Sequence, residues 1–162
     1  MTAINAGSRI LASVMQGAIP NAVIKPTDQS VTSSATLVND NDLLAAVAAN
    51  ATYLFFSYLD YEGAAAGDLK ISWVVPAAAT LRWAQIGQNS SSTATVASTG
   101  VETTSYTFGS DAAATLNALV MHGSLVTAGT SGNLQLQWAQ GTSSGTATKV
   151  HAQSFVALWR IS

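Results

Sequence analysis

Apolar and polar residues alternate along most of the chain with the period of two that is typical of β-strands. In the segment GNLQLQWAQGTSSG, Leu134, Leu136 and Trp138 alternate with Gln135 and Gln137. One face of this strand is therefore apolar and the other carries amides. A strand face in contact with water usually carries some Lys or Glu, and this one carries neither. The pattern predicts a β-strand and raises the question of what its amide face contacts.

Ten segments with this pattern are expected to form strands. Turn-forming sequences separate them, among them NDND (39–42), EGAAAGD (62–68) and GTSSG (141–145). Short strands that follow one another without a helical pattern indicate an all-β protein, and we expect an antiparallel β-sandwich or jelly-roll-like domain over residues 21–162. The expected strands are residues 29–38, 43–48, 51–62, 69–75, 79–88, 93–98, 102–108, 114–127, 133–140 and 147–161.

The segment 112–121 fits two structures. A helix could begin at Asp111, whereas Val120, Val126 and the glycines at positions 123 and 129 favour a strand. We expect the strand.

The first twenty residues differ from the rest of the chain. Their apolar residues follow helical spacing, so Ser8 to Gln16 is expected to form a short helix that ends at Gly17. Two or three turns of helix are not stable alone. We therefore interpret residues 1–20 as an N-terminal arm that anchors the domain to another protein. The candidate anchor residues are Ile10, Leu11, Val14 and Met15.

Two segments are apolar on both faces of the expected strand. In TYLFFSYLDY, Phe56 and Tyr58 lie opposite a second apolar face, and in SFVALWRI Trp159 lies opposite Leu158. Such strands are either central in a covered sheet or face another subunit. Amide faces can also be buried between subunits, where an unpaired charge would cost several kcal/mol. We expect self-association, with candidate interface residues Phe56, Tyr58, Gln135, Gln137 and Trp159.

Composition narrows the classes of protein to which the chain can belong. Only 9% of its 162 residues are charged, against about 25% in typical domains, yet its hydrophobicity is too high for a disordered chain. The net charge is −2 and the six Lys and Arg residues are scattered, so we expect no nucleic-acid partner. No apolar run approaches the ~20 residues of a membrane-spanning helix, so we expect no membrane partner. The absence of cysteine excludes disulfides and thiolate metal sites.

Two motifs with possible chemistry have simpler structural interpretations. GTSSG, with Ser143 at its centre, matches the nucleophile elbow of hydrolases. That elbow requires a helix directly afterwards and an acid followed by a histidine downstream, but a strand pattern follows, and Asp111 is the last acidic residue of the chain. We expect a hairpin loop. His122 and His151 have no nearby third ligand for a metal, so we expect structural histidines that are hydrogen-bonded.

The remaining polar and aromatic candidates also favour structural roles. NDND lacks the Gly and Glu positions of a calcium loop and is expected to form a turn. Asp60, Glu62 and Asp68 could supply a glycosidase dyad, but they lie at a strand end and in a Gly-rich loop, where solvated carboxylates are common. The four tryptophans fall on apolar strand positions, which indicates core or interface rather than a sugar platform. We expect no enzyme, no cofactor and no metal.

Six segments in order along the chain carry a family resemblance. They are AGSRILASVMQG, KPTDQSVTSSATLVNDNDL, AANATYLFFSYLDYEG, DLKISWVVPAAATLRW, LQLQWAQGTSSGTATKVHAQSF and ALWRI. Together they resemble a family of small virion structural proteins and fibre domains that are encoded by tailed phages of actinobacteria. The resemblance covers nearly the whole chain, and the second and fifth segments are its most specific parts.

The resemblance implies a β-rich homotrimer with no catalytic residues, located in the virion and assembled in the cytoplasm of the bacterial host. We expect a capsid decoration or head-fibre protein whose arm contacts the major capsid protein or another virion protein. A minor tail or tail-fibre component is one alternative. A receptor- or glycan-binding module, with an exposed Trp or Tyr against a host-surface glycan, is another. An enzyme that uses Ser143 or His151 is the least favoured.

Overall fold

A computed structural model describes residues 19–91, 94–101 and 104–162. The described residues form twelve strands and no helix, which confirms the expected all-β class. The expected helix from Ser8 to Gln16 lies outside these ranges. The strands are β1 (Asn21–Ile24), β2 (Gln29–Val31), β3 (Val38–Val47), β4 (Thr52–Glu62), β5 (Leu69–Val74), β6 (Thr80–Gln88), β7 (Thr95–Val101), β8 (Tyr106–Phe108), β9 (Asn117–Val126), β10 (Gly132–Gln140), β11 (Thr148–Val150) and β12 (Phe155–Arg160).

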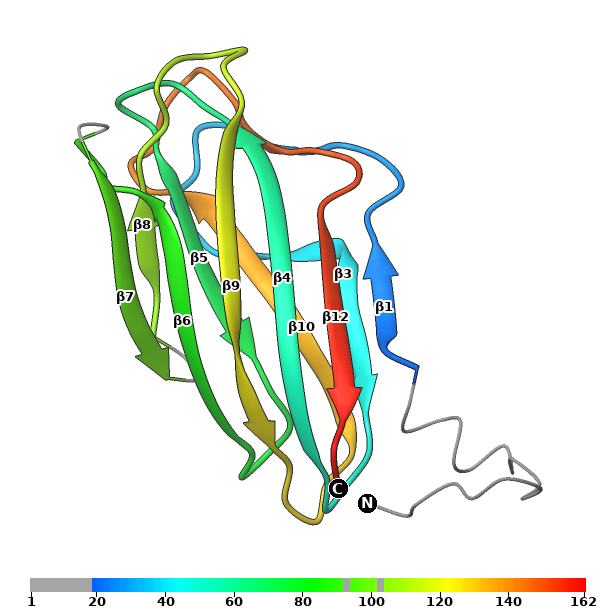
Figure 1. Cartoon of the computed structure of the whole chain (residues 1–162). Helices are drawn as coiled ribbons and strands as arrows, with labels where there is room; N and C mark the ends of the chain where they lie inside the picture. Colours follow the sequence, from blue (N-terminus) through cyan, green and yellow to red (C-terminus); the bar gives the residue numbers. More distant parts are fainter. Residues whose placement is uncertain (1–18, 92–93, 102–103) are drawn as a thin grey trace, which may run out of the picture.

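The strands form two antiparallel sheets that lie face to face (Figure 1). The larger sheet has the order β1-β12-β4-β9-β6-β7, and β11 extends it by pairing with both β4 and β2. The smaller sheet has the order β3-β10-β5-β8. Neighbouring strands are mostly distant in sequence. β4, for example, lies between β9 and β12. The sandwich is thus built from long-range pairings.

The core lies between the two sheets and consists of the apolar side chains that alternate along each strand. Phe55 and Leu59 of β4 face Trp73 of β5 and Trp138 of β10 across this core, and all four are buried. The rings of Phe55 and Trp73 meet edge to face at 5.6 Å, a favoured geometry for aromatic pairs. The alternation read from the sequence is therefore the inward and outward alternation of the sheets.

One glycine sets how closely two central strands approach. Gly123 of β9 lies between Phe55 and Trp83 in the register of the larger sheet. A Cβ atom at this position would lie 2.1 Å from the backbone oxygen of Arg82, which no side chain can occupy. The absence of a side chain thus allows β9 and β6 to pair in this register.

NDND is the one expected turn that the structure overturns, because these residues begin β3. Asp40, the second residue of the motif, is buried, and its carboxylate binds the ammonium group of Lys25 at 2.9 Å. The same carboxylate accepts a hydrogen bond from the indole N–H of Trp138 at 3.0 Å. A partner from a distant part of the chain therefore stabilises an acidic strand where local propensity favours a turn.

Two other expectations need correction at strand boundaries. The expected strand 29–38 is limited to β2, and β1 forms without having been expected. The expected strand 147–161 is divided into β11 and β12, because Gln153 has a left-handed φ of 69° and its N–H donates to the carbonyl oxygen of Lys25. The segment 112–121 is not helical. Its second half belongs to β9, as expected for the strand alternative.

Candidate functional site

The outer face of the larger sheet carries apolar side chains where a solvated face would carry polar ones. Along β4, Leu54, Phe56 and Tyr58 point outward, while the residues between them are buried in the core. Leu54 is 48% exposed and Phe56 is 37% exposed. We call this surface the apolar face. Its large apolar side chains are Ile24, Leu54, Phe56, Tyr58, Ile86, Val120, Val126, Phe155 and Trp159.

The apolar side chains are arranged in rows that cross neighbouring strands. In one row Tyr58 pairs with Phe155 on one side and with Val120 on the other. The row extends to Ile24 of β1 and to Ile86 of β6. It therefore crosses five strands of the larger sheet without a polar residue. Residues that share such a row are close enough for their side chains to be in contact.

Two further rows continue the apolar face along the strands. Phe56 pairs with Ala157 and with His122, and Leu54 pairs with Trp159 and with Ser124. The row of Leu54 ends on β6 with Arg82, which pairs with Ser124. The face is thus apolar at its centre and becomes polar toward Arg82, at one end of β6.

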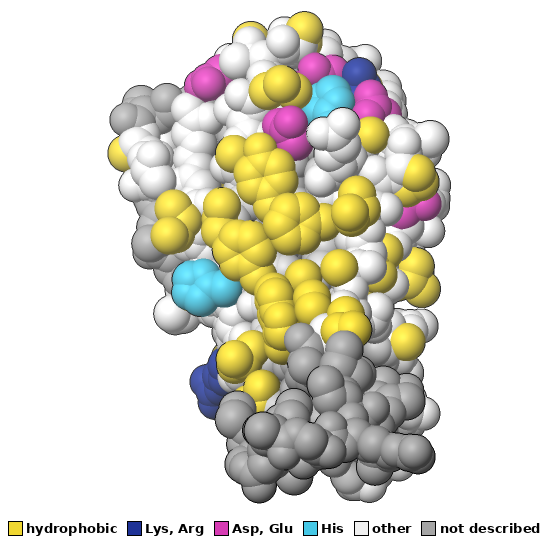
Figure 2. Space-filling view, turned by 45° about the vertical axis from the view of Figure 1, so that its right-hand side comes forward, with side chains coloured by type: hydrophobic (Ala, Val, Ile, Leu, Met, Phe, Trp, Pro, Cys, Tyr) yellow, Lys and Arg dark blue, Asp and Glu magenta, His cyan; other side chains and the backbone are white. Residues whose placement is uncertain are grey.

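Aromatic packing holds part of the face in place. The ring of Phe155 lies 5.8 Å from that of Phe56 and 6.2 Å from that of Tyr58, centroid to centroid. Figure 2 shows apolar side chains gathered in a continuous band on this side of the molecule, with charged side chains around its margins. Contiguous exposed apolar surface of this kind is typical of protein interaction sites.

A charged cluster lies beyond one end of the apolar face. The ammonium group of Lys149 lies 2.9 Å from the carboxylate of Glu62, and this hydrogen bond raises the pKa of Lys149. The ring of His151 lies between two carboxylates, 3.3 Å from Asp28 and 3.4 Å from Glu62. A hydrogen bond from the N–H of Ala152 lowers the pKa of Asp28. This cluster stabilises the β11 end of the sheet and leaves the centre of the face uncharged.

A single acidic residue separates the charged cluster from the apolar rows on β4. Asp60 lies one outward position beyond Tyr58. Burial is the main cause that raises the pKa of the Tyr58 hydroxyl, and the charge of Asp60 raises it further. Tyr58 is therefore neutral over the physiological range and contributes to the face as an aromatic ring.

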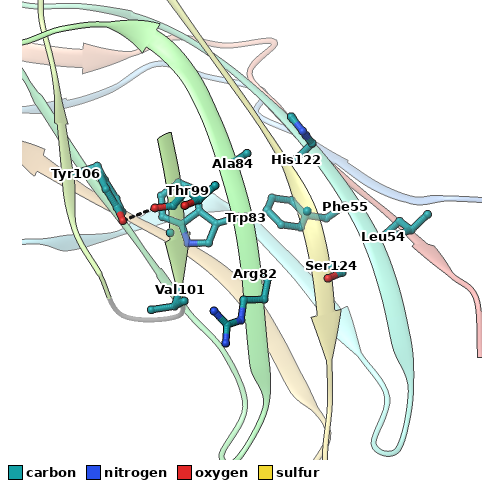
Figure 3. A pocket seen from close by; sticks show the side chains of 12 residues that line it. Leu54, Phe55, Arg82, Trp83, Ala84, Thr99, Val101, Tyr106, His122 and Ser124 are labelled. Atoms are coloured by element: carbon teal, nitrogen blue, oxygen red, sulfur yellow. Dashed lines mark hydrogen bonds between the residues drawn. The ribbon is translucent and has the colours of Figure 1, made fainter. Parts of the chain in front are cut away.

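A hollow of about 810 Å³ opens beside the apolar face (Figure 3). Arg82, His122 and Ser124 line it together with Leu54. Tyr106 of β8 also lines the hollow, and its hydroxyl donates a hydrogen bond of 2.6 Å to the backbone oxygen of Thr99. The side chains around it are chemically mixed, with one cation, one imidazole and the hydroxyl groups of Ser124, Thr99 and Tyr106.

The structure brings together three of the five side chains expected at an interface. Phe56, Tyr58 and Trp159 all lie on the apolar face. Gln135 and Gln137 lie instead on the outer face of the smaller sheet, where the strand irregularity in β10 falls between them. The interface role of these two glutamines stays a prediction.

The amide face of β10 makes its hydrogen bonds within the chain. The side-chain amide of Gln135 donates a hydrogen bond of 2.9 Å to the carbonyl oxygen of Asp40. The amide of Gln137 donates to the side-chain oxygen of Asn39, also at 2.9 Å. The two glutamines therefore hydrogen-bond to β3, and a carboxylate, which only accepts hydrogen bonds, could not replace them as donors to these oxygens.

The tryptophans, Ser143 and His151 lie in different parts of the molecule. Trp73, Trp83 and Trp138 are buried in the core, whereas Trp159 is 36% exposed. Ser143 is exposed in the loop between β10 and β11, and a strand follows the loop. The expected hairpin was wrong, because β10 and β11 belong to different sheets and the loop passes from one sheet to the other. His151 contacts two carboxylates as described above.

The expectation of a hydrogen-bonded structural histidine was wrong for His122. His122 is exposed on the apolar face, and within the described ranges its side chain has no hydrogen-bond partner.

The described residues contain no group of three or more His, Cys, Asp or Glu side chains placed to hold a metal ion. No helix in the described part of the chain is long and apolar enough to cross a membrane. The anchor candidates Ile10, Leu11, Val14 and Met15 lie outside the described residues.

Six of the nine side chains of the apolar face were not among the expected interface residues: Ile24, Leu54, Ile86, Val120, Val126 and Phe155. Val120 and Val126 occupy outward positions of β9, and their alternation with buried Leu119 and Leu125 was a usable signal. Ile24 was missed because β1 is only four residues long and lies between two prolines. Its place on the face is set by pairing with Phe155.

No family model and no curated protein sequence matches the chain. The solved structures similar to the chain include proteins of infectious bursal disease virus. A structure of the Gx strain of infectious bursal disease virus shares 9% identity at a TM-score of 0.21, over 86% of this chain and 38% of that chain. The VP2 protein of the same virus in T=1 particles shares 10% identity at a TM-score of 0.22, over 99% and 44%. This chain thus spans less than half of each, and TM-scores this low do not indicate a shared fold or function.

Proposed function

We propose that the chain is a non-enzymatic structural component of a virion that acts by contact between protein surfaces. The observation that carries this proposal is the apolar face, which extends over five strands and exposes large side chains such as Phe56 and Trp159. Exposed apolar area of this extent favours association over catalysis. The resemblance of the sequence to structural proteins of actinobacterial phages supports the same role.

The finer proposal is a homotrimeric capsid decoration or head-fibre protein. In it, residues 1–20 anchor the domain to the major capsid protein or another virion protein, and the β-sandwich projects outward. The trimer and the place on the head rest on the sequence resemblance. The short apolar stripe of residues 10–15 supports the anchoring role, because a stripe of this length needs a partner to bury it.

Copy number tests the place in the particle. Quantitative mass spectrometry of purified phage particles should find the chain in hundreds of copies if it decorates the head. A few copies per particle would instead favour a minor tail or tail-fibre component. Absence from purified particles would contradict the proposed function altogether.

Substitutions in the full chain test the anchor. Leu11→Asp places a charge in the apolar stripe, so the protein should keep its fold and oligomeric state and no longer join particles. Ala12→Asp is the matched control, because it adds the same charge next to the stripe and should still be incorporated. Equal incorporation of both variants would contradict the anchoring role.

Binding of a host-surface glycan is a second candidate function. The hollow beside the apolar face favours it, because it combines Arg82, His122 and Ser124 with the aromatic ring of Tyr106. Sugars are bound by such combinations of hydrogen-bonding groups and ring faces. A glycan array should then detect binding by the wild-type chain and its loss in the Arg82→Ala and Tyr106→Ala variants. No binding to any glycan by the wild-type chain would contradict this candidate.

A further inference from the structure

The middle of the apolar face is uncharged along one central strand, β4, from Thr52 to Tyr58. β4 is third in the order of six strands, and its outward side chains Leu54, Phe56 and Tyr58 are followed by a charge only at Asp60. In a closed homo-oligomer, the same residue of each copy comes close to its own equivalents near the symmetry axis. A charged residue there would meet the same charge. The uncharged middle of the sheet is therefore the part of the face suited to lie at an axis.

The size of the apolar face favours an occupant as broad as the sheet itself. Five strands at a spacing of ~4.8 Å are ~24 Å wide, and the rows from Thr52 to Tyr58 extend about as far, which gives on the order of 600 Å². Each partner in a standard-size interface contributes about 800 Å². A single helix, ~10 Å in diameter, would cover less than half of this width. Another sheet face covers it fully.

We propose that the apolar face is the surface at which copies of this chain meet, with Leu54, Phe56 and Tyr58 closest to the symmetry axis. The occupant of the face is thus a second copy of this chain. We call Leu54, Phe56 and Tyr58 the central column. Phe155 and Val120 lie on either side of it and enlarge the area that a second copy would bury. The inference rests on the proposed function only for the expectation that the chain self-associates. The surface itself follows from the structure.

The charges at the margins fit the same arrangement. Asp60 and Arg82 both point outward on the larger sheet, on β4 and β6, and lie in rows separated by those of Phe56 and Tyr58. Neither has an ion-pair partner within residues 19–91, 94–101 and 104–162. A neighbouring copy can offer the opposite charge to each at the rim, where such pairs determine register more than affinity.

A charge placed in the central column tests the proposal in the full chain. Phe56→Lys should raise the dissociation constant of the oligomer at least ~30-fold, the loss expected for an aromatic side chain at the centre of an interface. Leu44→Lys is the matched control, because Leu44 is also 37% exposed but lies on the smaller sheet. Sedimentation velocity over a range of concentrations measures both, and circular dichroism confirms that each variant is folded.

Chemical cross-linking gives an independent measurement that does not add a charge. The chain has no cysteine, so Phe56→Cys and Leu44→Cys each introduce a single thiol. Stacked sheets lie ~10 Å apart, which is within the span of a short bismaleimide. The Phe56→Cys chain should give covalent dimers with this reagent, and the Leu44→Cys chain should remain single.

The outcomes separate this inference from the proposed function. An oligomer that persists in Phe56→Lys, or a Phe56→Cys chain that is not cross-linked, overturns the inference even if the protein is found in particles. A monomeric wild-type chain also overturns it, and the face is then covered by something other than a second copy. If the wild-type oligomer is lost in Phe56→Lys but the protein is absent from particles, the inference stands and the proposed function fails.

Discussion

Lys25 is a lysine whose side chain has no exposed surface, in a chain with few charges. Its ammonium group lies 2.9 Å from the carboxylate of Asp40 and 3.0 Å from that of Asp42. A buried lysine is tolerated only when it is paired in this way. The pairing attaches the segment between β1 and β2 to the start of β3, and Asp40 extends it to the indole of Trp138. A few polar residues thus position the edge of the larger sheet against the smaller one.

Removal of the lysine leaves buried acidic groups without their cation. Lys25→Met should lower the free energy of unfolding by ~3–5 kcal/mol, since breaking a buried pair costs much more than the pair contributes. Lys149→Met is the control, because the ion pair of Lys149 is partly exposed and should contribute at most ~1 kcal/mol. Urea unfolding monitored by tryptophan fluorescence measures both. Equal losses would show that the Lys25 pair is not buried in solution.

The carboxyl group of Asp68 should make the free energy of unfolding depend on pH. Burial raises its pKa, although the N–H of Ser110 donates to its carboxylate and opposes the shift. Because the folded-state pKa is higher than the unfolded one, the folded chain binds more protons between the two values. Stability therefore falls as the pH rises through that interval. Asp68 also has a left-handed φ of 55°, which asparagine tolerates well.

Asp68→Asn should therefore raise the unfolding temperature near pH 7. The difference from wild type should disappear near pH 3, about one unit below the ordinary pKa of an aspartate, where the wild-type carboxyl is neutral as well. Thermal unfolding followed by circular dichroism at both pH values gives the comparison. A difference that grows toward acidic pH would have the wrong sign and would contradict this account.

At the scale of elements, β4 joins the core to the apolar face. It pairs along most of its length with β9 and β12, and its alternate side chains enter the core and the outer face. Gly123 of β9 lies opposite Phe55 in this pairing, and a Cβ atom there would lie 2.9 Å from the Phe55 ring. A change in this small area therefore affects both the core and the shape of the apolar face.

Gly123→Ala should destabilise the sheet strongly. The new Cβ atom would lie 2.1 Å from the backbone oxygen of Arg82, so β9 and β6 must separate. We expect a loss of at least ~3 kcal/mol, the upper end of the range for overpacked sites. Gly129→Ala is the control, because nothing lies within 4 Å of its Cβ position, and it should change stability by less than ~1 kcal/mol. Denaturant unfolding that gave similar values for both would contradict the close approach of the strands.

At the scale of the whole molecule, the two sheets present different outer faces. The larger sheet presents aromatic and aliphatic side chains such as Phe56 and Ile86. The smaller sheet presents hydrogen-bonded amides such as Gln135 and Gln137 beside exposed aliphatic side chains such as Leu44 and Val74. Charged groups lie mainly at the ends of the sandwich. The side with the aromatic rows is therefore the more suited of the two to association.

Association through an uncharged face should respond to temperature more than to salt. Raising the ionic strength from about 0.05 M to about 0.5 M should leave the oligomer intact, since screening weakens only interactions between charges. Cooling should weaken the oligomer, because hydrophobic association loses strength at low temperature. Sedimentation velocity under the two salt conditions and at two temperatures tests this. Dissociation by salt would indicate an electrostatic interface instead.

Much of the fold follows from the alternation of apolar and polar residues within each strand. The outward positions of Phe56, Tyr58 and Trp159 were predictable because alternation is set within each strand. The start of β3 was not predictable in this way, because Asp40 is a strand residue only through its contact with Lys25. Ile24 belongs to the apolar face only through its pairing with Phe155. Residues that depend on a distant partner are the ones for which the expectations failed.

The sequence by itself therefore determined the all-β class, the two faces of most strands and the low charge of the chain, since each depends on neighbouring residues. Only the tertiary structure decided which strands lie side by side. It placed Phe56, Tyr58 and Trp159 on one face and Gln135 and Gln137 on the other sheet. The physical reason is that strand order and register depend on pairings between segments far apart in the chain, and the free energy of each such pairing depends on all the others.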